Sequence, residues 1–120
     1  MNGVREIGEA EFEQAVIQAE LPVLVDFYAP WCGPCRALAP ALEGVAKTYE
    51  GRLEVVKVNV DDAPQLAHNY RVRGVPTLMI FQGGKAADTM VGIPPLNALK
   101  NKLNAVTAPS TRVGVCGCCA

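Results

Sequence analysis

The chain lacks the signals that mark membrane, nucleic-acid-binding or secreted proteins. It has a single histidine, and its 11 basic and 12 acidic residues give a formal net charge of −1. This balance leaves no cationic surface for nucleic acid or for an anionic membrane. No apolar run approaches the roughly 20 residues that a membrane span needs. The first residues lack the apolar core of a secretion signal, so we expect a cytoplasmic protein in a reducing compartment.

The chain also lacks the even, dispersed cysteines of a disulfide-stapled framework. Its five cysteines are an odd number and fall in two clusters. The length of 120 residues fits one domain, and half of the residues are hydrophobic, which is enough for a real core. The cysteines are therefore expected to carry chemistry rather than to hold the fold together.

The first cluster consists of Cys32 and Cys35, separated only by Gly33 and Pro34. An apolar run over residues 21–29 precedes it and a helical pattern follows, so the thiols lie at a strand-to-helix turn. Free backbone N–H groups at a helix start favour a thiolate over a thiol. We expect the sulfur of Cys32 to face outward and to be the more exposed of the two. Pro34 suits the first helical turn.

The alternative to a redox dithiol at this place is half of a zinc knuckle. A zinc site needs a second Cys or His pair at ligand spacing in the same domain. His68, the only histidine, has no such partner, and we expect it to face solvent from a short helix. We therefore predict no metal site in the domain and interpret Cys32 and Cys35 as a redox dithiol.

Asp26 is unusual because it lies within an apolar strand pattern at residues 23–29. Burial of a carboxyl group raises its pKa, which would make Asp26 a proton carrier near neutral pH. The alternative is an Asp that turns to solvent or acts as a cap. Lys57 is similarly enclosed by valines in the pattern at residues 53–60. It either extends its amine to the surface or faces Asp26 across neighbouring strands.

The hydrophobic periodicity predicts a mixed α/β domain. Helices are expected to begin at Gly8, at Cys32 or Pro34, within Asp61-Asp62-Ala63-Pro64 with an Asp as the N-cap, and at Pro94-Pro95. The apolar faces of the last two helices are expected to consist of Leu66, Ala67 and Tyr70, and of Leu96, Leu99, Leu103 and Val106. Strands are expected at residues 3–7, 23–29, 53–60, 78–82 and 85–91. This order predicts a central mixed five-stranded sheet with four helices on both faces.

Two segments together resemble the thioredoxin family, and the resemblance extends from about Ile7 to about Val106. The residues that carry it are Trp31-Cys32-Gly33-Pro34-Cys35 after Val25-Asp26-Phe27-Tyr28-Ala29, and Gly74-Val75-Pro76-Thr77. The resemblance implies the thioredoxin fold and a thiol–disulfide oxidoreductase that reduces protein disulfides. Cys32 would attack the substrate, and Cys35 would then release it.

The resemblance also implies roles for other residues. Asp26 would lie buried behind the dithiol and take the proton of Cys35, and Lys57 would face Asp26. The Val75–Pro76 bond would be cis. Around Cys32 we expect the redox-tuning pair Gly33 and Pro34, and a substrate-binding surface of Trp31, Val75, Pro76, Gly92 and Ile93. Tyr28 stands where many members of the family carry a second Trp.

The expected partners follow from the same resemblance. They are disulfide-containing protein substrates and an NADPH-dependent thioredoxin reductase, and we expect a monomer that binds no cofactor. An oxidant or isomerase is the alternative within this class, but it would usually carry a His between its two cysteines. Gly33 and Pro34 supply no such cation, which favours a reductant.

The resemblance ends before the C-terminus, so we divide the chain into a domain at residues 1–106 and a flexible tail at residues 107–120. The tail holds the second cysteine cluster, Cys116, Cys118 and Cys119. We consider three interpretations for these thiols: a passive end of the chain, a soft-metal site, or a redox relay to Cys32. Outside the enzyme class, one alternative is a metal- or metalloid-binding protein that uses these three thiols. The other is a scaffold subunit, a role that the family resemblance also allows.

Overall fold

The computed structural model describes residues 3–107, which form one α/β domain. Its helical segments are α1 (Glu9–Phe12), the π-helical segment η1 (Glu13–Ile17) that continues it, α2 (Gly33–Thr48), α3 (Pro64–Asn69) and α4 (Leu96–Thr107). Its strands are β1 (Val4–Glu6), β2 (Val23–Tyr28), β3 (Glu54–Asn59), β4 (Thr77–Gln82) and β5 (Lys85–Val91). The predicted five strands and four α-helices are thus confirmed.

The five strands form one mixed sheet in the order β1-β3-β2-β4-β5. Strands β1, β3 and β2 run parallel, while β4 is antiparallel to both β2 and β5. The turn between β4 and β5 uses Gly83 and Gly84 at φ values of 63° and 84°, which suit a tight hairpin. β2 lies at the centre of the sheet, and only its last residue, Tyr28, is not fully buried.

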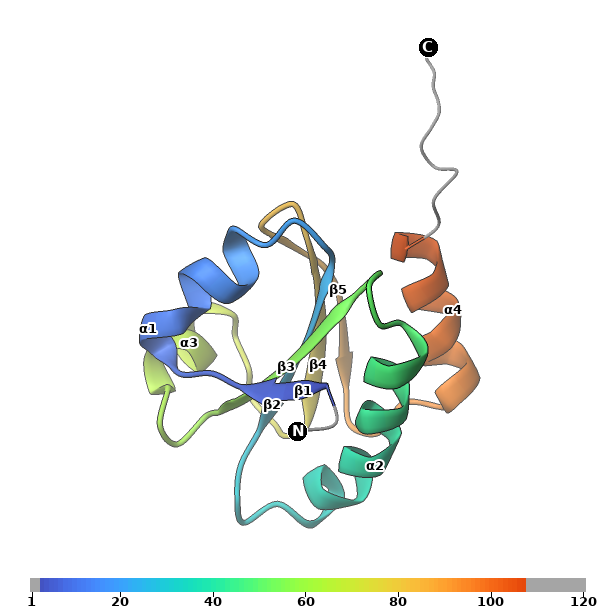
Figure 1. Ribbon diagram of the computed structural model, residues 1–120. Helices are drawn as coiled ribbons and strands as arrows, with labels where there is room; N and C mark the ends of the chain where they lie inside the picture. Colours follow the sequence, from blue (N-terminus) through green and yellow to red (C-terminus); the bar gives the residue numbers. More distant parts are fainter. Residues whose placement is uncertain (1–2, 108–120) are drawn as a thin grey trace.

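Each face of the sheet has its own hydrophobic core. Helices α2 and α4 cover one face, and α1, η1 and α3 cover the other (Figure 1). Successive residues of β2 point to opposite faces, so Leu24 packs under α2 and α4 while Val25 packs under α1 and α3. This double covering explains why the strand is apolar on both faces, and it makes the carboxyl group of Asp26 an exception inside the core.

The first helix differs from the regular helix that the periodicity predicts. After Phe12 it widens into a π-helical segment, in which the amide of Gln18 donates to the carbonyl oxygen of Glu13 at 2.9 Å. Phe12 and Val16 are buried, whereas Ala19 is half-buried. Both large side chains pack into the core on the α1–α3 side of the sheet.

The start of α3 corrects the prediction of an Asp N-cap. The N-cap residue is Ala63, because Asp61 and Asp62 belong to the preceding turn, where the amide of Asp62 donates to the carbonyl oxygen of Asn59. A carboxylate still satisfies the first amides of the helix. It comes from Glu9 of α1, whose Oε2 accepts hydrogen bonds from the amides of Gln65 at 2.8 Å and Leu66 at 3.3 Å.

The predicted apolar faces of α3 and α4 are correct only in part. Leu66, Ala67 and Tyr70 are half-buried, because this two-turn helix lies at the margin of its core. In α4, Leu99 and Leu103 are buried and Val106 packs beside them, but Leu96 is 46% exposed. Leu96 is the first residue of the helix, and the packing against the sheet begins one turn later.

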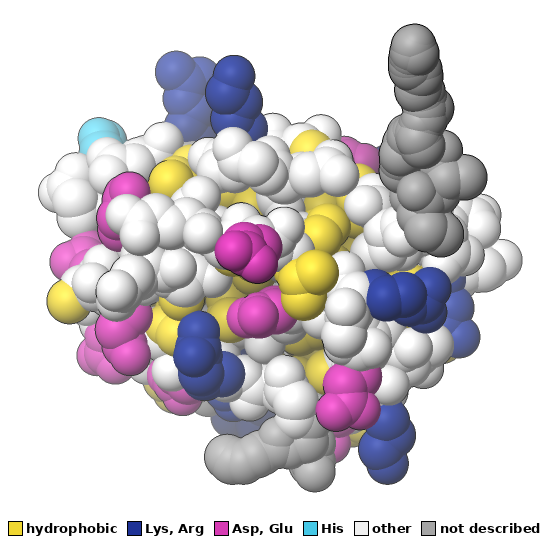
Figure 2. Space-filling view, turned by 45° about the horizontal axis from the view of Figure 1, so that its top comes forward, with side chains coloured by type: hydrophobic (Ala, Val, Ile, Leu, Met, Phe, Trp, Pro, Cys, Tyr) yellow, Lys and Arg dark blue, Asp and Glu magenta, His cyan; other side chains and the backbone are white. Residues whose placement is uncertain are grey.

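The surface has no large area of one charge on the side that Figure 2 shows, where acidic and basic side chains are interspersed among small apolar areas. Between residues 3 and 107, no helix combines the length and the apolar character needed to cross a bilayer.

Candidate active site

Cys32 and Cys35 form a disulfide at the N-terminus of α2. Cys32 is the N-cap residue of the helix, and its sulfur accepts a hydrogen bond from the amide of Cys35 at 3.1 Å. Its own amide donates to the carbonyl oxygen of Ala29 at the end of β2. Pro34 lies in the first turn, where its missing N–H leaves no helical bond unmade. The predicted strand-to-helix turn is therefore confirmed.

The prediction that Cys32 is the more exposed thiol is wrong for this disulfide form. Cys32 is 4% exposed and Cys35 is 5% exposed, so accessibility does not distinguish them. The reason is the packing around the pair, because Tyr28, Val60 and Val75 close over it. The sulfur of Cys32 lies 3.7 Å from the carbonyl oxygen of Val75.

Among the predicted substrate-binding residues, Val75 packs against this disulfide and Trp31 directly precedes Cys32 in the chain. The Val75–Pro76 bond is cis, as the resemblance implies. The carbonyl oxygen of Pro76 accepts a hydrogen bond from the amide of Gly92 at 2.8 Å, which joins the two predicted loops. Trp31 and Ile93 are 68% and 53% exposed, which is unusual for large apolar side chains.

Sequence reasoning missed one further exposed apolar residue next to this surface. Val91 is 74% exposed at the end of β5, directly before Gly92. Beside the disulfide, a pocket of about 390 Å³ adds further apolar lining; its walls are Trp31, Val60, Pro64, Ala67, His68, Val72, Arg73, Gly74 and Val75. His68 faces solvent, as predicted.

Two hydrogen bonds fix the loop that carries Trp31, and sequence reasoning missed both. The indole Nε1 of Trp31 donates to Oδ2 of Asp61 at 3.1 Å. On the other side, the guanidinium of Arg36 donates to the carbonyl oxygen of Pro30 at 2.7 Å. The exposed ring is thus bonded to the β3–α3 turn, and the backbone just before it is bonded to the first turn of α2.

Asp26 lies inside the sheet face that α2 covers, and it is 4% exposed. Its Oδ1 has no hydrogen-bond partner among residues 3–107. Burial raises the pKa of Asp26 to about 7, and the nearby Lys57 ammonium opposes part of that rise. The predicted burial and raised pKa are confirmed, and the carboxyl group can gain or lose a proton near neutral pH.

Lys57 is the direct neighbour of Asp26 in the register between β2 and β3. Both side chains line a pocket of about 340 Å³ under α2, together with Val4, Glu6, Ala39, Leu42 and Glu43. The interpretation that Lys57 faces Asp26 across neighbouring strands is therefore the one that the geometry favours.

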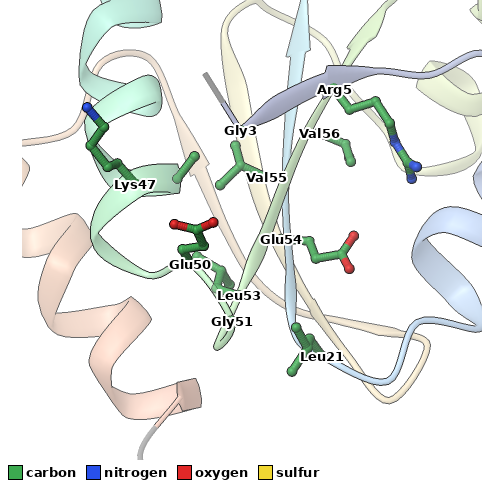
Figure 3. Close-up of a pocket in the computed structure, with 11 residues that line it drawn as sticks. Gly3, Arg5, Leu21, Lys47, Glu50, Gly51, Leu53, Glu54, Val55 and Val56 are labelled. Carbon is green, nitrogen blue, oxygen red and sulfur yellow. The ribbon is translucent and has the colours of Figure 1, made fainter. Parts of the chain in front are cut away.

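A larger pocket, of about 520 Å³, lies away from this chemistry (Figure 3). Its wall includes Lys47 in the last turn of α2 and Glu50 and Gly51 just after the helix, whereas Cys32 caps the start of that helix. A helix of 16 residues is about 24 Å long, so this pocket cannot contribute a group to the dithiol. Figure 3 shows that its charged side chains come from the end of α2 and from β1 and β3.

The described residues contain no group of three His, Cys, Asp or Glu side chains arranged to hold a metal ion. Cys116, Cys118 and Cys119, and with them most of the predicted tail at residues 107–120, lie outside the described residues.

Comparison with known proteins identifies a matching family model and several similar proteins. The Thioredoxin family model matches residues 3–105. Thioredoxin 1 of Nostoc sp. is 48% identical over 103 residues, which cover 86% of this chain and 96% of that protein. Thioredoxin of Porphyra purpurea is 48% identical over 101 residues, covering 84% of this chain and 94% of that protein. The chloroplastic M-type thioredoxin of Spinacia oleracea is 36% identical over 106 residues, covering 88% of this chain and 59% of that protein.

Proposed function

The chain belongs to the thioredoxin family and is a thiol–disulfide oxidoreductase, and we propose that Cys32 is its nucleophile and Cys35 its resolving thiol. The hydrogen bond from the Cys35 amide to the sulfur of Cys32 carries this assignment. The same N–H, together with the positive end of α2, would stabilise a thiolate on Cys32 once the disulfide is reduced. The sulfur of Cys35 has no corresponding helix N-terminus, since it is already inside the first turn.

The reaction then consists of two exchanges. The Cys32 thiolate attacks one sulfur of the substrate disulfide, which forms a mixed disulfide and releases the first substrate thiolate. The Cys35 thiolate next attacks the sulfur of Cys32 and releases the second substrate thiolate. The substrate gains two electrons, and the protein ends as the Cys32–Cys35 disulfide that the structure holds.

Asp26 is proposed as the base for the second exchange. Cys35 must lose its proton before it can attack, and a carboxylate with a pKa of about 7 can accept that proton at physiological pH. Lys57 would support this role, because its ammonium stabilises the ionised form of the neighbouring carboxylate. Gly33 and Pro34 would tune the dithiol towards a reductant, because neither of these two residues between the cysteines carries a positive charge.

The substrate is proposed to be an extended segment of a protein that contains a disulfide. Trp31 and Ile93 offer exposed apolar surface for it. The backbone of Val75 reaches the sulfur of Cys32, where it could pair with the segment next to the substrate cysteine. Pro76 and Gly92 would complete this wall through the hydrogen bond that joins them.

The electron source is proposed to be an NADPH-dependent thioredoxin reductase, with the protein acting as a cytoplasmic monomer and binding no cofactor itself. Residues 1–106 would form the working domain, and the tail at residues 107–120 would be dispensable.

A reductase-coupled assay that follows NADPH oxidation with insulin as the substrate tests the function. We expect turnover with the native chain and none with Cys32→Ser; full turnover with Cys32→Ser would refute the proposal.

A further inference from the structure

Three ionisable side chains lie in one row across three neighbouring strands. In the parallel register, Glu6 of β1 is opposite Lys57 of β3, and Lys57 is opposite Asp26 of β2. Paired residues of adjacent strands project to the same face of a sheet, and the strands are about 4.8 Å apart. The ammonium of Lys57 therefore has a carboxyl group on each side, of which one is the buried Asp26 and the other is exposed.

Tyr28 joins this row from β2. It is two residues beyond Asp26 and so projects to the same face. Its hydroxyl donates a hydrogen bond to Oε2 of Glu6 at 2.5 Å, and the Nζ of Lys57 lies 5.2 Å from the centre of its ring. Burial, and then the hydrogen bond to Glu6, raise the pKa of Tyr28 above its ordinary value, so the hydroxyl keeps its proton.

The carboxylate of Glu6 is thus held by Tyr28 rather than by Lys57. The only ion pair with N and O atoms within 4.0 Å among residues 3–107 joins Lys102 to Asp88, on α4 and β5. Lys57 sits against the tyrosine ring without a direct salt bridge to either carboxyl group of its row. The two carboxyl groups nearest to it in the register are those of Asp26 and Glu6. The hydroxyl of Tyr28 holds the exposed one, Glu6, by a hydrogen bond.

Within the described range 3–107, Lys57 is the one cation that lines the pocket of Asp26. The charged and titratable groups that line the space are Glu6 from β1, Lys57 from β3 and Glu43 from α2. On the remaining side, the β4 neighbour of Asp26 in the register is the apolar Leu78. The position of Lys57 therefore decides how strongly the ionised form of Asp26 is stabilised.

We propose that Glu6 and Tyr28 are positioning residues for Lys57: the hydroxyl of Tyr28 holds the Glu6 carboxylate, which keeps the ammonium available to Asp26. The consequence for the reaction rests on the proposed role of Asp26 as the base for Cys35. The placement itself can be tested without turnover, because Asp26 titrates in the folded disulfide form.

The two substitutions that probe this arrangement have opposite expected effects. Tyr28→Phe releases Glu6, which then pairs with its register neighbour Lys57 and draws the ammonium away, so the titration midpoint of Asp26 rises. Glu6→Gln removes the competing charge, so the midpoint falls. For charges one or two strand spacings apart, we expect each shift to be about half a pH unit. In the Glu6→Gln background, Tyr28→Phe should add no further shift.

The experiment is a set of unfolding titrations on the full oxidised chain. The free energy of unfolding is measured by denaturant from pH 4 to pH 9 for each variant, with and without Asp26→Asn, and the difference between the two curves isolates the titration of Asp26. The matched controls are Glu54→Gln and Tyr49→Phe. The first removes an exposed acidic charge from β3 rather than from β1, and the second removes the hydrogen bond of a different tyrosine.

Opposite shifts from the two variants, and no effect of Tyr28→Phe once Glu6 is neutral, support the proposal. Midpoints that move no more than those of the controls would overturn it. So would an equal loss of stability at every pH, since that result would mean that the Glu6–Tyr28 bond only secures the edge strand β1. Failure of the proposed function would appear instead as absent turnover, whatever these midpoints are.

Discussion

The amide of Cys35 donates a hydrogen bond to the sulfur of Cys32 at 3.1 Å, within the first turn of α2. The two cysteines are equally buried as a disulfide, so this bond, rather than accessibility, is what separates their chemistry. Only Cys32 receives a backbone N–H and faces the positive end of the helix. The difference in their roles follows from the position of each residue at the helix start.

Asp26→Asn should make the protein more stable above neutral pH. The folded chain keeps the proton of Asp26 up to a pH of about 7, whereas an unfolded Asp releases it near 3.8. Stability is therefore lost as the pH rises above the unfolded value, and the full penalty is reached above the folded one. At about 1.4 kcal/mol per pH unit, the penalty at pH 8 is on the order of 4 kcal/mol.

Denaturant titrations of the native chain and of Asp26→Asn at pH 4.5 and pH 8 check this prediction. The stability gain should be small at the lower pH and a few kcal/mol at the higher one. The same substitution should slow resolution of a mixed disulfide by about 100-fold at pH 7, which is the lower end of the loss expected when a general base is removed. A gain that is the same at both pH values would contradict the account of a buried, titrating acid.

Trp31→Ala should weaken the reaction with protein substrates and spare small ones. The ring is 68% exposed and fixed by its bond to Asp61, so its removal costs binding surface and leaves the dithiol geometry in place. Loss of one aromatic anchor typically costs 1–2 kcal/mol, so we expect kcat/KM for a protein disulfide to fall by about tenfold.

A small aromatic disulfide serves as the comparison substrate, and its rate constant should change by less than about twofold, because it needs no extended docking surface. Leu96→Ala is a suitable control, since Leu96 is also an exposed apolar residue but lies on α4, outside the predicted surface. An equal loss for both substrates with Trp31→Ala would mean that the ring supports the chemistry rather than the docking.

A chain that ends at Thr107 should retain reductase-coupled turnover. Leu99 and Leu103 close the packing of α4 against the sheet before that point, so the truncation removes no described core contact. The comparison should be made in metal-free buffer and again with a stoichiometric soft metal. Loss of turnover on truncation without metal would favour a relay through Cys116, Cys118 or Cys119. Loss only of metal binding would favour a thiolate site in the tail.

Local patterns predicted most of the fold and the chemical centre of the site. The burial of Asp26 could be foreseen because its neighbours along the chain are apolar and the strand is covered on both faces. The dithiol at a helix start followed from the spacing of its cysteines and the change of periodicity after them. The cis bond before Pro76 came from the family resemblance alone, because no local signal in one sequence specifies it.

Contacts between distant segments could not be predicted in the same way. The bond from Trp31 to Asp61 joins residues 30 apart, and the bond from Tyr28 to Glu6 joins residues 22 apart. Glu9 caps a helix that begins 55 residues later, which is why an Asp was expected at that cap instead. Each of these pairs depends on how strands and turns meet in three dimensions. The same is true of the loop of Val75 that covers Cys32.

The central claim is that Cys32 attacks and Cys35 resolves, and trapping of the intermediate tests it most directly. Cys35→Ser and Cys32→Ser are each mixed with an oxidised protein substrate, and the products are analysed by mass spectrometry after proteolysis under non-reducing conditions. A tail-free chain ending at Thr107 is used so that the other three thiols cannot react. We predict that Cys35→Ser accumulates a mixed disulfide through Cys32, while Cys32→Ser gives none. A stable adduct through Cys35 in the Cys32→Ser variant, formed at a comparable rate, would contradict the account.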